Sequence, residues 1–341
     1  MNSLEKLLGQ ESYQSFLESH KLKERLVFMT YGGSYAYGTN IEGSDIDIRG
    51  CALNTSEEIL LNRDFEQYMK NNDEMDICVY SVNKLIGLLS NCNPNTIEML
   101  GMPVDKYAYL SDVGRLLIDN TKLFLSKRAV QSFGGYASQQ LRRLGNKAVR
   151  KVPQSERERY ILASLNNAKY SFGERYLNGI GELDLYVDDA VGEDLDQEIF
   201  MDVDLKHYPL RDYVGMVSEL QSIIRSYNKN SKRNEYAASH NKIGKHMMHL
   251  IRLYLMCFDI LEKGQVITYR EKDRDYLLEI RNGRYLDEND QPTDEFYDIV
   301  DKYEARLDEL ACKSKLPDNP DVEAINALRM KINRKIVETK E

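Results

Sequence analysis

The sequence predicts an α+β fold, in which a small mixed sheet flanked by helices is followed by a mostly α-helical region. Two observations carry this prediction. Short apolar runs bounded by turn residues, which are typical of strands, are concentrated in the first 110 residues. Beyond them, apolar residues recur mainly at helical spacing. We therefore expect two domains, residues 1–110 and residues 111–341, since a chain of 341 residues is long enough for two.

Charge is distributed unevenly along the chain. The net charge is −9, but residues 115–175 contain thirteen Lys/Arg and four Asp/Glu. Residues 181–204 contain ten acidic residues and no basic one, and we expect them to form a hairpin or a flap at the surface. The net negative charge argues against simple nonspecific binding to nucleic acid, and the uneven distribution is more informative than the total.

Three further features indicate the compartment. The apolar runs are too short to span a bilayer, and the first residues lack the pattern of a signal peptide. The five cysteines are scattered and form no Cys-x-x-Cys, which favours free thiols over disulfides or a zinc site. We therefore expect a cytoplasmic protein without a membrane partner.

The elements of the first domain follow from these patterns in chain order. A helix is expected over residues 4–22 and strands over 24–31, 44–52 and 75–81. Residues 57–70 give no clear assignment. Ser81 is a candidate cap for the helix that follows it, and residues 93–100 predict a turn and a short helix.

A glycine-rich turn follows the apolar residues 26–29, which predict a buried strand. Gly32 and Gly33 allow the backbone to turn sharply and to approach a ligand closely, because glycine carries no Cβ. Ser34 then opens a short helical segment, where unpaired backbone N–H groups favour an anion. The turn is therefore a candidate phosphate-binding element.

Acidic and apolar residues alternate at the start of the strand expected over residues 44–52. Successive side chains of a strand point to opposite faces. One face carries Ile46 and Ile48, and the other carries Asp45, Asp47 and Arg49. Neighbouring carboxylates repel each other unless a cation lies between them, and a spacing of about 7 Å along a strand suits Mg²⁺ that also binds substrate phosphates. The alternative is the solvated face of an edge strand.

Strand, Gly-Ser turn, short helix and Asp-x-Asp together resemble the signature of the DNA polymerase β-type nucleotidyltransferase superfamily. The order of these and later motifs is similar to a group of predicted nucleotidyltransferases of bacteria and their phages. The motifs are Ser-Asp-Ile-Asp-Ile-Arg-Gly (44–50), Asn-Pro-Asn-Thr-Ile-Glu-Met-Leu (93–100), Lys-His-Met-Met-His-Leu-Ile-Arg-Leu (245–253) and Leu-Leu-Glu-Ile-Arg-Asn-Gly (277–283).

The resemblance implies a specific set of roles. Gly33 and Ser34 would bind the β and γ phosphates of a nucleoside triphosphate, with ATP as the expected one. Asp45 and Asp47 would hold two Mg²⁺ ions, with Mn²⁺ as an alternative, and a third carboxylate would lie on a neighbouring strand. Asp76 is our candidate, because it begins an apolar strand after a polar run, although by itself it would be read as a simple strand-start residue. Asp73 and Glu74 are rivals in the preceding loop.

A strongly amphipathic helix is predicted for residues 239–254. At 100° per residue, its apolar residues gather on one side and its basic residues on the other. The basic side carries Lys242, Lys245, His246, His249 and Arg252. A solvated face and a zinc site are alternatives, but five basic groups without an acid favour a stripe that faces phosphate or RNA. We therefore assign Lys242, His246, His249 and Arg252 to nucleotide binding.

The expected activity is metal-dependent transfer of a nucleoside monophosphate to an acceptor hydroxyl, with release of pyrophosphate. The basic segment and the basic helix favour an RNA 3′ end, for example that of a tRNA, as the acceptor. A hydroxyl of a protein or a small molecule is the alternative. A noncatalytic nucleotide-binding module is a hypothesis of another class, and the oligomeric state is not defined by the sequence.

Overall fold

A computed structural model of the chain describes residues 3–72, 75–148, 154–170, 172, 183–191, 197–228, 242–288 and 290–338. The chain divides into two compact units. The first contains Met1–Gly134, Arg252–Leu278 and Asp301–Glu341, and the second contains Gly135–Ile251 and Glu279–Val300. Segments from the C-terminal half thus return to the first unit, whereas the sequence suggested a single boundary near residue 110.

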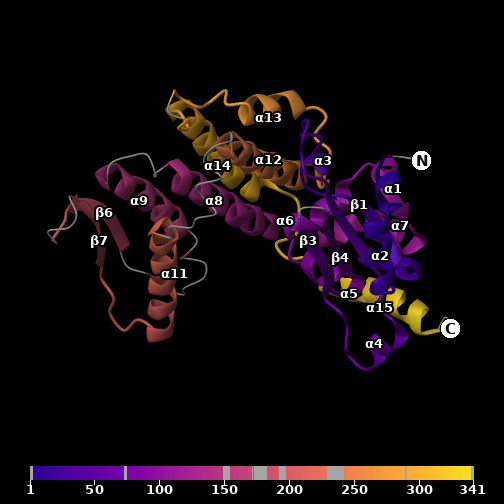
Figure 1. Ribbon diagram of the computed structural model, residues 1–341. Coiled ribbons are helices and arrows are strands. Elements are labelled where there is room, and N and C mark those ends of the chain that lie inside the picture. Colours follow the sequence, from indigo (N-terminus) through magenta and orange to yellow (C-terminus); the bar gives the residue numbers. More distant parts are fainter. Residues whose placement is uncertain are drawn as a thin grey trace. The chain divides into compact units, whose positions relative to one another are not determined.

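The first unit is built on a five-stranded mixed sheet (Figure 1). The strand order is β3-β4-β2-β1-β5, in which β2 and β4 run parallel and the other neighbours antiparallel. This sheet and the mostly helical remainder of the chain confirm the predicted fold class. The strands are β1 (Leu26–Tyr31), β2 (Asp47–Ala52), β3 (Gln67–Asn72), β4 (Met75–Ser81) and β5 (Tyr107–Leu110).

Helices α1 (Ser3–Leu8) and α2 (Glu11–Ser19) cover one face of the sheet. A single helix over residues 4–22 was expected, but the chain leaves the helical conformation at Gly9, where glycine is about 1 kcal/mol less favourable than alanine. The core beneath these helices is apolar. It contains Leu4, Phe16, Leu17, Leu22, Met29, Ile48, Ala52, Ile77 and Val79.

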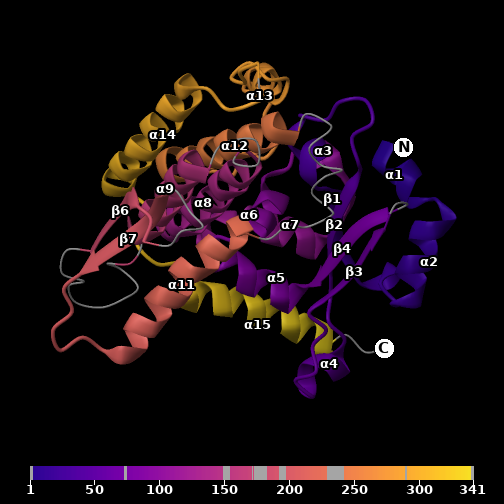
Figure 2. The same ribbon diagram turned by 60° about the vertical axis from the view of Figure 1, so that its left-hand side comes forward.

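Helices also pack against the sheet on the side away from α2, where Figure 2 shows α5 (Val82–Leu89). The Ser81 side chain accepts a hydrogen bond from Lys84 N at 3.1 Å, so it caps α5 as predicted. Other helices of this unit include the short α3 (Gly33–Tyr37), α4 (Ser56–Leu60), α6 (Pro94–Ile97), the 3₁₀ helix η2 (Glu98–Gly101) and α7 (Asp112–Asp119), and the longer α15 (Val322–Glu338).

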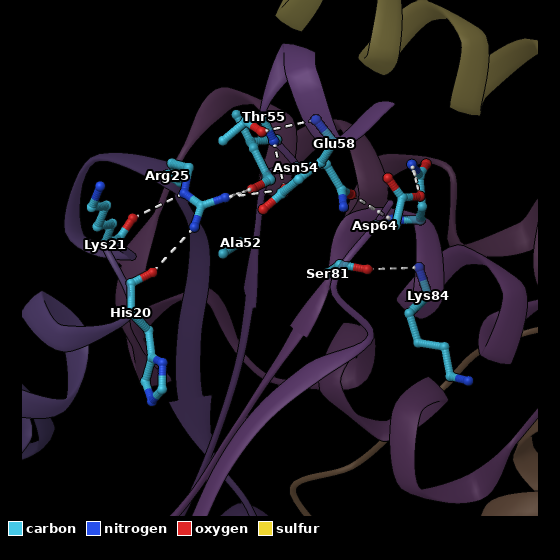
Figure 3. A network of polar contacts seen from close by, with 12 residues as sticks. His20, Lys21, Arg25, Ala52, Asn54, Thr55, Glu58, Asp64, Ser81 and Lys84 are labelled. Atoms are coloured by element: carbon cyan, nitrogen blue, oxygen red, sulfur yellow. Dashed lines mark hydrogen bonds and ion pairs between the residues drawn. The ribbon is translucent and has the colours of Figure 1, made fainter. Parts of the chain in front are cut away.

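A polar network closes the end of the β1–β2 pair that lies away from the glycine turn (Figure 3). The Arg25 guanidinium donates to the carbonyl oxygen of Leu53 at 3.2 Å and to Glu58 Oε2 at 3.3 Å. The Glu58 carboxylate also accepts from Thr55 N, while Thr55 Oγ1 accepts from Glu58 N, which forms a capping box for α4. The start of β1 and the segment after β2 are therefore tied together.

The second unit contains helices and one hairpin. The acidic segment forms the antiparallel strands β6 (Leu183–Asp189) and β7 (Gln197–Val203), one of the two expected forms. One face of this hairpin packs against α9 (Gln154–Tyr170) and α11 (Leu210–Asn228) through a small apolar core. Four helices contribute residues to both units: α8 (Arg128–Ala148), α12 (Lys242–Lys263), α13 (Arg274–Arg281) and α14 (Asp294–Lys313).

Candidate active site

Two acids meet where the parallel strands β2 and β4 begin. Asp47 is the first residue of β2 and Asp76 the second residue of β4, and their Cα atoms are partners in the strand register. The next residue of each strand, Ile48 or Ile77, is buried in the core under α1 and α2, so the acids lie on the opposite face. Their side chains remain 26% and 27% exposed, which leaves them accessible.

The guanidinium of Arg49 lies between the two carboxylates. Its Nη1 donates to Asp76 Oδ1 at 2.7 Å, and its Nη2 is 3.6 Å from Asp47 Oδ1. The amide of Asn71 donates to the other Asp76 oxygen at 2.6 Å. Burial acts to lower the pKa of Arg49, but the hydrogen bond to Asp76 and the charges of both acids raise it above its ordinary value. The pair of carboxylates thus already shares one cation.

The glycine turn lies directly against this acid pair. Gly32 N donates to the carbonyl oxygen of Asp47 at 2.8 Å. Gly33 has a φ of +54°, and a Cβ added to it would lie 1.8 Å from Asp47 Oδ2. Only glycine fits there, because a side chain would be strained and would displace the carboxylate. Ser34, which is 8% exposed, follows within the short helix α3.

Asp45 takes a different position from the one the alternating pattern suggested. Strand β2 begins at Asp47 and not at residue 44, and Asp45 is exposed in the loop before it. The reason is a turn at Gly43, with φ +77°, which is closed by a hydrogen bond from Ile41 N to Ser44 Oγ at 2.9 Å. Among the described residues, no three His, Cys, Asp or Glu side chains are grouped so as to hold a metal ion. The structure therefore joins two of the three expected ligands.

Arg252 does not lie on an open basic face, as the sequence led us to expect. It is 6% exposed, its Nη1 is 3.5 Å from Glu98 Oε2, and its guanidinium stacks on the ring of Tyr37 at 3.6 Å. A buried guanidinium needs a counter-charge, and Glu98 supplies it. The direct phosphate contact assigned to Arg252 is thus replaced by an internal ion pair.

The other four residues of the predicted basic side, Lys242, Lys245, His246 and His249, belong to the second unit. Nδ1 of His246 is 3.1 Å from Gln140 Oε1, and His249 is half-buried. The side chain of Lys242 lies outside the described residues. The assignment of Lys242, His246 and His249 to nucleotide binding stays a prediction.

Two residues of this region were not assigned a role by sequence reasoning. Glu98 is 7% exposed in η2 and accepts a hydrogen bond from the Tyr37 hydroxyl at 2.8 Å. Glu98 lies in the motif of residues 93–100, so the signal was present, but an acid in an apolar helix has no identifiable partner in the sequence alone. Tyr37 ends the helix that begins at the glycine turn.

Comparisons with known proteins concern the chain as a whole and its first half. In the part of the chain that the structure describes, no helix has the length and apolar character needed to cross a membrane. Neither the search of curated proteins nor that of solved structures finds a match. A family model does match, over residues 8–162, and this stretch contains the glycine turn and both paired acids. The resemblance to polymerase β-type nucleotidyltransferases that the motifs led us to expect is thus confirmed by the match of residues 8–162 to the model of the RNA repair pathway DNA polymerase beta family.

Proposed function

We propose that this chain is a metal-dependent nucleotidyltransferase that acts on RNA. It transfers a nucleoside monophosphate from a nucleoside triphosphate to an acceptor hydroxyl and releases pyrophosphate. The observation that carries this proposal is the register pairing of Asp47 with Asp76 beside the turn at Gly33. The family match supports nucleotidyl transfer in RNA repair as the general activity.

The acid pair fits a divalent cation. Asp47 and Asp76 already share the guanidinium of Arg49, and two accessible carboxylates are the protein ligands that Mg²⁺ prefers beside substrate phosphates. Asp45, in the adjoining loop, would supply a further carboxylate. We assign two Mg²⁺ ions to these acids, with Mn²⁺ as an alternative. Bound Mg²⁺ would neutralise phosphate charge and lower the pKa of the attacking hydroxyl.

The residues around the metal position the substrate. In this proposal, Gly33 and Ser34 bind the β and γ phosphates of the triphosphate, ATP being the first to test. The acceptor oxygen forms a bond to the α-phosphorus while the bond to pyrophosphate breaks, and Asp76 accepts the hydroxyl proton. The protein would accelerate the reaction mainly by orienting the reacting groups and by compensating the charge of the phosphates.

An RNA 3′ hydroxyl is the acceptor we propose, with a tRNA end as one example. The name of the matched family concerns RNA repair, and the local excess of thirteen basic over four acidic residues in 115–175 suits an RNA backbone. Affinity that depends on several phosphate contacts falls steeply with salt. A protein or small-molecule acceptor would show little such dependence.

The test uses triphosphates with label at either the α or the γ phosphate. The protein is incubated with each one, Mg²⁺ and a short RNA that ends in a 3′ hydroxyl or a 3′ phosphate. We expect α label to join only the 3′-hydroxyl RNA, and γ label to appear in pyrophosphate. Binding of the triphosphate without transfer to RNA, protein or small molecules would instead support the noncatalytic module.

Substitutions of the acids sharpen this test. Asp47→Asn and Asp76→Asn keep the size of the side chain and remove the charge, so we expect transfer to fall at least about 100-fold. Asp298→Asn, on the exposed side of α14, is the matched control and should retain full activity. Full activity in both Asp47→Asn and Asp76→Asn would overturn the assignment of this site.

A further inference from the structure

A buried polar cluster joins three elements of the first unit. Tyr37 comes from the end of α3, Glu98 from η2 and Arg252 from α12, and all three are at most 7% exposed. The Tyr37 hydroxyl donates to Glu98 Oε2 at 2.8 Å, Arg252 pairs with the same oxygen at 3.5 Å, and the guanidinium covers the Tyr37 ring. A buried acid with both a donor and a counter-charge is a defined arrangement and not a solvated surface.

This cluster adjoins the candidate active site. Burial raises the pKa of Glu98, and the charges of Arg49 and Asp47 also act on that pKa, one lowering it and the other raising it. Tyr37 is the last residue of the five-residue helix α3, whose first residue is Gly33. The cluster thus holds the far end of the helix that presents the glycine turn.

The segment after α12 holds the same end of α3 by hydrogen bonds to two main-chain carbonyl oxygens. Arg270 N donates to the carbonyl oxygen of Tyr37 at 3.0 Å, and Arg274 Nε donates to that of Gly38 at 2.8 Å. Gly38 has a φ of +73° and packs against the ring of Tyr269, where a Cβ would lie 2.9 Å from a ring carbon. The buried side chain of Arg270 is itself held by ion pairs to acidic residues.

A helix of five residues is not stable by itself, so its position is set by the groups that hold it. Gly33 lies directly against the Asp47 carboxylate. A small shift of α3 therefore moves the backbone of Gly33 and Ser34 relative to Asp47, and displacements of about 1 Å can reduce the rate of a positioned reaction by about 100-fold.

We infer that Glu98, with Tyr37 and Arg252, is a positioning residue that fixes the glycine turn for the triphosphate. This inference rests on the proposed function. It assigns to Arg252 an indirect role in nucleotide binding: the side chain does not contact phosphate, but it helps to hold the helix whose backbone does.

The chain offers a matched pair of variants. Tyr37→Phe removes the hydroxyl that donates to Glu98 and keeps the ring under Arg252. Tyr254→Phe removes a buried hydroxyl that donates to Glu304 Oε1 at 2.9 Å, on the same helix as Arg252. Both changes delete one tyrosine–glutamate hydrogen bond, so their effects on thermal unfolding should be similar.

We expect the two variants to differ in nucleotide affinity. Calorimetric titration with the triphosphate and Mg²⁺, together with kcat and KM in the transfer assay, should show binding weakened about tenfold in Tyr37→Phe and unchanged in Tyr254→Phe. Glu98→Gln keeps an acceptor for Tyr37 but removes the charge facing Arg252, and if it folds it should weaken binding at least as much.

Each remaining outcome has a distinct meaning. If the wild type binds the triphosphate and the two tyrosine variants bind it equally well, the positioning role is wrong while the proposed function stands. If the wild type binds no triphosphate and transfers no label, the proposed function is wrong and the positioning role falls with it.

Discussion

Replacing Gly33 by alanine tests the contact between the glycine turn and the acid pair. The added Cβ would lie 1.8 Å from Asp47 Oδ2, whereas real contacts of this kind are essentially never shorter than 3.0 Å, so the two atoms must separate by more than 1 Å. The backbone cost of φ +54° for alanine is about 1–2 kcal/mol. The displaced carboxylate should lower kcat/KM about 100-fold, which corresponds to about 2.7 kcal/mol of transition-state stabilisation.

Gly43→Ala is the matched control for this substitution. Gly43 has a similar left-handed conformation, with φ +77°, but a Cβ there meets nothing within 4 Å. Both variants share the backbone cost, so Gly33→Ala should lose at least as much thermal stability as Gly43→Ala, measured by calorimetry, because it adds the clash with Asp47. Only Gly33→Ala should lose transfer activity and calorimetric Mg²⁺ binding. Equal activity of the two variants would refute the reasoning that Gly33 is needed for the position of Asp47.

Three other measurements address separate parts of the structure. Arg49→Met removes the cation between Asp47 and Asp76, so we expect the metal-free protein to lose about 1–2 kcal/mol of unfolding free energy. Added Mg²⁺ should restore this stability. A variant whose melting temperature does not respond to Mg²⁺ would speak against a shared cation site. Burial raises the pKa of Glu304 above its ordinary value of 4.5, although the hydrogen bond from Tyr254 lowers it. Glu304 therefore makes the folded protein lose stability as the pH rises from about 4.5 towards neutral. In denaturant titrations across pH, Glu304→Gln should lack this part of the loss. If the unfolding free energies of the wild type and the variant change with pH in parallel, this assignment is wrong. Cys312 is exposed and the other four cysteines are buried, so one thiol per chain should react rapidly with a thiol reagent in the native protein. Cys312→Ser should abolish this rapid reaction. Rapid reaction of several thiols would contradict the buried positions.

The sequence predicted the strand that carries Asp76 with its observed bounds, because residues 75–81 are strongly apolar and begin after a polar run. The same local signal placed Ile48 in the core and Asp47 on the opposite face. Strand β3 had no such signal, because Gln67–Asn72 is an edge strand with mostly exposed polar residues. Strand β3 pairs with β4 through main-chain hydrogen bonds, and these leave no periodic pattern of apolar residues in the sequence.

Polar contacts between residues that are far apart in the chain could not be predicted from sequence patterns. The amphipathic pattern placed Arg252 among basic residues and suggested a polar face, but the side chain is buried and forms an ion pair with Glu98, which is far away in the chain. The strand expected from residue 44 begins only at Asp47, because the turn at Gly43 ends shortly before it and leaves Asp45 in the loop. Periodicity identifies which residues share a face, while contacts between distant elements decide whether that face is open.

The parallel pairing of β2 and β4 makes the acid pair dependent on the apolar side of the sheet. A slip of β4 by one residue would turn Asp76 towards α1 and α2 and bring Ile77 beside Asp47, because side chains alternate between faces. Met75, Ile77 and Val79 oppose such a slip, since they would leave the core. Substitutions of these buried apolar residues should therefore change the spacing of the two carboxylates, although the apolar side chains lie on the opposite face of the sheet.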